Sequence, residues 1–187
     1  MRETHVFFIA LMSLTVILSA GCMKIPGVVD YIPFRDISSE YSIDDARTDS
    51  CVVYENSDIT SGQEIWNDFA GKASEGKKTM VRLAFYYDRE DTLSEGPRLY
   101  INDLFYDGNK YELLSLEEGK ETRKTYKYMK RYEGTPSSDT AIFSRYLRYV
   151  LVNTDEVTWE DIEHGMFSSQ SGDWIDHKTV YVNYDFE

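Results

Sequence analysis

The residues with the clearest potential for chemistry lie near the C-terminal end of the sequence. Glu160 and His164 are four positions apart, so on a helix their side chains would share one face. Asp173, Asp176 and His177 follow within a few residues. Such carboxylates and imidazoles are ligands of zinc or calcium, which makes these five residues a candidate metal centre for a metal-assisted surface hydrolase. The alternative is an acidic helix N-terminus with surface histidines beside it.

The motifs of the commoner enzyme families are missing from the sequence. It contains no GxGxxG, GxxxxGK[ST], HExxH or GxSxG pattern and no EF-hand loop. After residue 21 the only histidines are His164 and His177. We therefore expect a non-catalytic binding or interaction module that needs no cofactor, with the hydrolase as the alternative.

Tyrosine is the most unusual feature of the composition, with 15 residues in 187. In the run "TRKTYKYMKRYE", the alternation of an extended strand would place five residues on one side, namely Lys124, Tyr126, Tyr128, Lys130 and Tyr132. A face of tyrosine and lysine offers rigid amphipathic contact area, which suits a protein or glycan partner. The alternative is that tyrosine is favoured in strands, where cross-strand pairs stabilise the sheet.

The net charge of the chain limits its partners. With 33 acidic against 20 basic side chains, the formal net charge is −13. Nucleic acid is disfavoured as a partner because phosphate binding depends on lysine and arginine. The same charge also disfavours contact of the domain with an anionic membrane surface.

Hydrophobic periodicity predicts the elements that position these residues. Residues 79–87 alternate as a strand, with Arg82 on the side opposite Val81 and Leu83, and the Asp107-Gly108 turn predicts a hairpin. Capping-box patterns at 61–64 and 158–161 predict the starts of two helices. The expected fold is α+β, with two helices packed on a mostly antiparallel sheet of about five to seven strands.

The N-terminal residues indicate where the chain is located. An apolar block, Val6–Leu18, has the length of a signal-peptide core, and three small residues precede Cys22. This stretch resembles the lipobox of bacterial lipoproteins. The resemblance implies a signal peptide at residues 1–21, cleavage before Cys22, and a lipid on its sulfur that holds the protein at the cell membrane, facing the exterior.

The two cysteines allow two exclusive interpretations. If Cys22 carries a lipid, Cys51 is a free thiol packed as a small apolar side chain. If Cys22 keeps its thiol, a disulfide with Cys51 is feasible outside the cytoplasm. Residues 22–50 show no sustained periodicity and are interpreted as a tether to the globular domain at 51–187. The sequence leaves open whether the apolar patches of this tether dock on the domain.

Longer segments carry a second resemblance. The segments "LAFYYD", "LYINDLFYDGNKYELL", "TAIFSRYLRYVLVN" and "VTWEDIEHGMFSSQSGDWIDHKTVY" are similar to a group of small, uncharacterised lipoproteins of Gram-positive bacteria. The resemblance covers most of residues 51–187 and implies an extracytoplasmic lipoprotein. It brings no catalytic residues with it.

Overall fold

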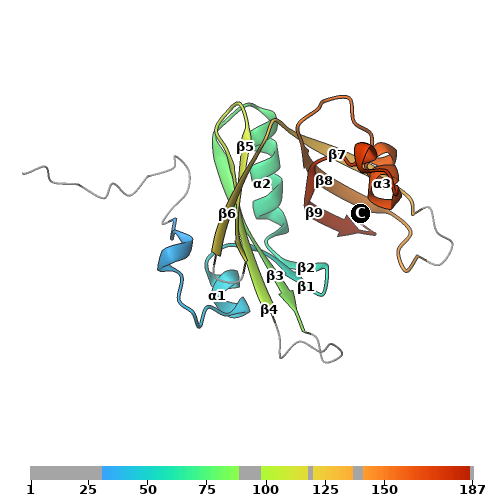
Figure 1. Cartoon of the computed structure of the whole chain (residues 1–187). Helices are drawn as coiled ribbons and strands as arrows, with labels where there is room; N and C mark the ends of the chain where they lie inside the picture. The colour runs from blue at the N-terminus through green and yellow to red at the C-terminus, as the bar shows by residue number, and fades with distance from the viewer. Residues whose placement is uncertain (1–30, 89–97, 118–119, 137–140, 186–187) are drawn as a thin grey trace, which may run out of the picture.

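The computed structural model describes residues 31–88, 98–117, 120–136 and 141–185. Across these ranges the chain forms three α-helices and nine strands, and the strands lie in two sheets (Figure 1). Six of the seven strand pairings are antiparallel. The predicted α+β class is therefore confirmed. The described strands are more numerous than predicted because a second sheet is present.

The larger sheet has six strands in the order β2-β1-β3-β4-β5-β6. Its strands are β1 (Val52–Glu55), β2 (Asp58–Ser61), β3 (Thr79–Tyr87), β4 (Arg98–Tyr106), β5 (Tyr111–Glu117) and β6 (Lys120–Tyr126). Strands β1 and β3 run parallel, and the chain between them passes through β2 and helix α2 (Gln63–Ser74). The predicted hairpin is confirmed at β4 and β5, where the Asp107 carboxylate accepts hydrogen bonds from the N–H groups of Asn109 and Lys110.

The smaller sheet has three strands in the order β7-β8-β9. Its strands are β7 (Tyr128–Gly134), β8 (Tyr146–Val152) and β9 (His177–Tyr184). Helix α3 (Trp159–Phe167) covers the outer face of this sheet, and the short 3-10 helix η2 (Ser171–Asp173) follows it (Figure 1). The predicted capping box at Thr158 and Asp161 is confirmed, since each side chain accepts a hydrogen bond from the other residue's N–H.

Helix α2 lies between the two sheets (Figure 1). Its buried side chains, Trp66, Phe69 and Ala73, join one hydrophobic core with Leu83 of β3 and other residues of both sheets. The start of α2 differs from the predicted capping box, because Gly62 is the N-cap residue and no side chain caps the helix. A Cβ at position 62 would lie 2.3 Å from the backbone oxygen of Cys51, so only glycine fits there.

The N-terminal segment, residues 31–50, packs on the larger sheet on the side opposite α2 (Figure 1). It contains the 3-10 helix η1 (Phe34–Asp36) and helix α1 (Ile43–Thr48), and it buries Phe34 and Ala46. The predicted boundary at residue 51 is therefore corrected: the N-terminal segment belongs to the folded domain. Residues 22–30 of the predicted tether lie outside the described ranges.

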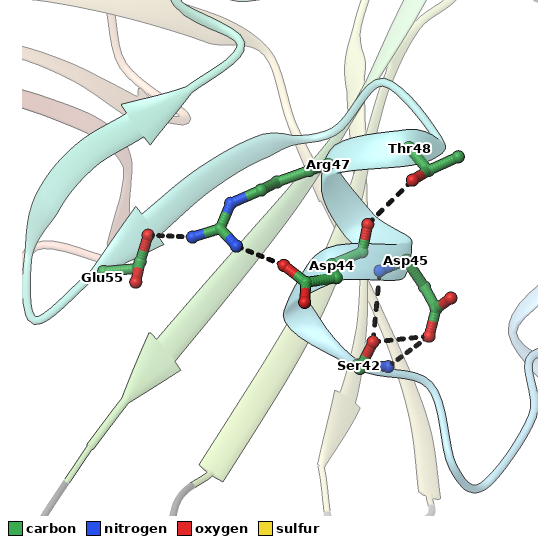
Figure 2. A network of polar contacts seen from close by, with 6 residues as sticks. All are labelled: Ser42, Asp44, Asp45, Arg47, Thr48 and Glu55. Atoms are coloured by element: carbon green, nitrogen blue, oxygen red, sulfur yellow. Dashed lines mark hydrogen bonds and ion pairs between the residues drawn. The ribbon is translucent and has the colours of Figure 1, made fainter.

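Polar contacts fix helix α1 in place (Figure 2). The Ser42 hydroxyl accepts a hydrogen bond from the Asp45 N–H (3.2 Å), and the Asp45 carboxylate accepts one from the Ser42 N–H (2.8 Å). This capping box satisfies N–H groups at the helix start that have no partner within the helix. Arg47 then bridges Asp44 of α1 and Glu55 of β1, which ties the helix to the sheet.

A buried ion pair lies under the N-terminal segment. The Arg82 guanidinium donates two hydrogen bonds to the Asp103 carboxylate, from Nε to Oδ1 (2.7 Å) and from Nη2 to Oδ2 (2.8 Å). Nη2 also donates to the backbone oxygen of Ile32, and the guanidinium lies over the rings of Tyr31 and Phe34. The ion pair therefore connects β3 and β4 to the N-terminal segment.

Candidate functional site

The five candidate metal ligands are not gathered into one centre. Glu160 and His164 are exposed on α3, Asp176 is exposed before β9, and Asp173 and His177 are half-buried. Within the described ranges, no group of three histidine, cysteine or acidic side chains has an arrangement that could hold a metal ion.

Two of these residues make contacts within the protein instead. The Asp173 carboxylate accepts a hydrogen bond from the Ser168 hydroxyl, which closes the turn after α3. Nδ1 of His177 lies 2.8 Å from the backbone oxygen of Ile175, and its ring lies beside Trp174. These contacts give the acidic segment a structural role in connecting α3 to β9.

The predicted tyrosine and lysine face does not form either, because the strand on which it was placed is two strands. The chain bends at Lys127, whose N–H donates to the Asn153 side chain (3.2 Å). Before the bend, β6 completes the larger sheet, and after it β7 starts the smaller one. Tyr126 and Tyr128 therefore belong to different sheets and pack in different hydrophobic clusters.

The positions of the individual residues confirm this separation. Tyr126 is 1% exposed, and burial raises the pKa of its hydroxyl. Tyr132 is half-buried and donates a hydrogen bond to the backbone oxygen of Val157, while Lys130 pairs with Asp155. Of the five residues only Lys124 is exposed, so the predicted binding surface is corrected.

Of the two cysteines, the described ranges include only Cys51. It is 1% exposed beneath α1 as a free thiol, and its sulfur lies 3.8 Å from the Tyr41 hydroxyl. Burial raises the pKa of the Cys51 thiol to about 11. These features suit an inert, packed side chain. Cys22 and the predicted signal peptide lie outside the described residues.

A pocket lies between the two sheets in the described part of the structure. Its volume is about 330 Å³, which is at the small end of the range for ligand sites. Seven residues line it: Phe85 and Tyr87 of β3, Tyr100 and Asn102 of β4, Leu116 of β5, and Lys178 and Thr179 of β9. The pocket thus combines aromatic rings with an amide and an ammonium group.

The strand register explains why these side chains meet. Phe85 is paired with Tyr100, and Leu83 with Asn102, so these residues share the face of the larger sheet that carries the common core. Toward the end of β3 and the start of β4 this face extends past α2 (Figure 1), and β9 supplies the other wall. The predicted strand at 79–87 included Phe85 and Tyr87, but nothing in the local sequence connects them to residues 178–179.

Comparison with protein families, curated proteins and solved structures finds no match to this chain. None of the helices in the described ranges is long and apolar enough to cross a membrane. The function must therefore be inferred from the sequence and the geometry.

Proposed function

We propose that this protein is an extracytoplasmic lipoprotein, anchored in the cell membrane through a lipid on Cys22, that acts as a non-catalytic binding module. The observation that carries the binding role is the pocket between the sheets. It has aromatic walls and a few polar groups, the usual composition of a small-ligand site. The lipobox-like sequence before Cys22 supports the anchor.

The docked N-terminal segment affects how such an anchor would act. Because Tyr31 already contacts the larger sheet, nine residue steps separate the lipid attachment site from the folded domain. Nine steps of extended chain span at most about 30 Å. The binding module would therefore act close to the external face of the cell membrane, on ligands that occur there.

Replacing Cys22 with serine tests the anchor. In a bacterial host that processes lipoproteins, the wild-type chain should take up an alkyne-labelled fatty acid and fractionate with membranes. The Cys22→Ser variant should lose both properties, and Cys51→Ser is the matched control that should keep them. An unlabelled wild-type chain in the soluble fraction would contradict the anchor.

The binding role predicts that a ligand will raise the melting temperature. At 100 times its dissociation constant, a ligand adds about 2.7 kcal/mol to stability, or about 5–10 °C for a domain of this size. A panel of neutral and acidic surface glycans and short peptides should contain at least one such ligand. Tyr100→Ala should abolish the shift, whereas Tyr128→Ala, outside the pocket, should not. If no member of the panel shifts the melting temperature, the binding role fails.

A further inference from the structure

Two walls of different chemistry face each other across the pocket. On the larger sheet, the half-buried rings of Phe85, Tyr87 and Tyr100 form an aromatic wall, in which Tyr87 and Tyr100 meet edge to face at 6.0 Å. On β9, Lys178 is paired with Leu151, which is buried in the core that both sheets share. Directly paired residues of antiparallel strands share a face, so Lys178 lies on the face turned toward the aromatic wall.

The polar groups of the pocket are not engaged by the protein. Throughout the described ranges, no hydrogen bond or ion pair occupies the Asn102 amide or the Lys178 ammonium. The amide can both donate and accept, whereas the ammonium can only donate. Together they match a ligand that has both hydroxyl groups and an acceptor with negative charge.

The charge at the pocket has the opposite sign to that of the chain. The formal net charge of the chain is −13, yet Lys178 is the only charged side chain among the described residues that line the pocket. An anionic group is therefore favoured here although the rest of the surface repels it.

We propose that the pocket binds a saccharide that carries a carboxylate. This proposal rests on the binding role proposed above. The C–H face of a sugar ring stacks on the tyrosine rings, its hydroxyl groups pair with the Asn102 amide, and the carboxylate accepts from Lys178. A single lysine matches one negative charge. Phosphate sites commonly add arginine forks or helix N-termini, whereas each described residue that lines this pocket lies on a strand.

Calorimetric titration of the detergent-solubilised full-length chain with two matched pairs of sugars tests this proposal. One pair is methyl glucuronide and methyl glucoside, and the other is N-acetylmuramic acid and N-acetylglucosamine. In at least one pair the acidic sugar should bind about tenfold more tightly, as expected for a hydrogen bond between charged groups. The two pairs distinguish a uronic acid from a sugar with a carboxylate side arm.

Lys178→Met keeps the aliphatic stem and should reduce the affinity for the acidic sugar to that for its neutral partner. Lys124→Met, an exposed lysine on β6 away from the pocket, should leave the affinities unchanged. If both members of each pair bind equally and Lys178→Met changes neither affinity, the proposed ligand class is wrong. The binding role would still hold in that case. No binding of any of the four sugars would overturn the ligand class, while the wider panel still tests the binding role.

Discussion

Replacing Asp103 with alanine is expected to lower the free energy of unfolding by about 3–5 kcal/mol, because removing one partner of a buried ion pair leaves the other charge without compensation. Asp103 is fully buried, and the Arg82 side chain is 9% exposed. Burial raises the pKa of the Asp103 carboxyl, and the hydrogen bonds and charge of Arg82 oppose this rise. The remaining guanidinium would keep only the Ile32 oxygen and the two rings above it.

The loss should reach the N-terminal segment as well, because Tyr31 donates a hydrogen bond to Asp103 (3.1 Å). Undocking of this segment would let water reach Arg82, so trypsin should cleave after the exposed Arg35 faster in Asp103→Ala than in the wild type. Urea denaturation followed by circular dichroism measures the stability, and the rate of cleavage measures the docking.

Two controls distinguish the buried pair from a general effect of lost charge. Arg123→Ala removes ion pairs at the exposed surface of β6, and it should cost less than about 1 kcal/mol. The double variant Arg82→Met/Asp103→Leu removes both charges and should recover much of the stability, since apolar side chains can replace a buried pair. If Asp103→Ala costs no more than Arg123→Ala, the ion pair is not buried in solution.

The position of Arg82 shows what a strand pattern can and cannot predict. The alternation at residues 79–87 correctly places Arg82 on the face opposite Val81 and Leu83, where a charged side chain suggests contact with water. This face is instead covered by a segment 50 positions earlier in the chain, which supplies the Ile32 oxygen. Contacts between residues so far apart in the sequence produce no periodic pattern within the strand itself.

Helix α1 was missed although a local signal exists. The residues Ser42-Ile43-Asp44-Asp45 follow the same pattern as Thr158-Trp159-Glu160-Asp161, which predicted the start of α3 correctly. The difference is length. Helix α1 has only six residues and one buried side chain, so no apolar stripe follows its cap.

The candidate site was harder to predict than the fold. Alternation suggests a continuous strand through Lys127, but the side chain of Asn153 stabilises a bend there, and the chain enters the second sheet. The pocket brings together residues of β3, β4, β5 and β9, and each of these stretches reads as ordinary strand sequence. Only the packing of one sheet against the other gives these residues a common surface.

Replacing Trp66 with alanine should have an effect as large as that of Asp103→Ala, because Trp66 joins the two sheets that form the pocket. It is 1% exposed on α2 and stacks on Tyr181 of β9 with 4.3 Å between ring centroids. It also meets Tyr149 of β8 edge to face at 5.1 Å. Removing a buried tryptophan costs about 3–5 kcal/mol, from lost transfer energy and from the cavity that remains.

Two variants define the origin of this effect, with urea denaturation followed by circular dichroism as the measurement. Trp66→Phe keeps a ring against Tyr181 and removes a buried indole N–H that has no hydrogen-bond partner within the described ranges, so its cost should be well below that of alanine. Trp174→Ala changes a tryptophan that is 57% exposed and should stay within about 0.5 kcal/mol of the wild type. If Trp66→Ala is as mild as Trp174→Ala, the two sheets do not share a core, and the pocket between them has no rigid second wall.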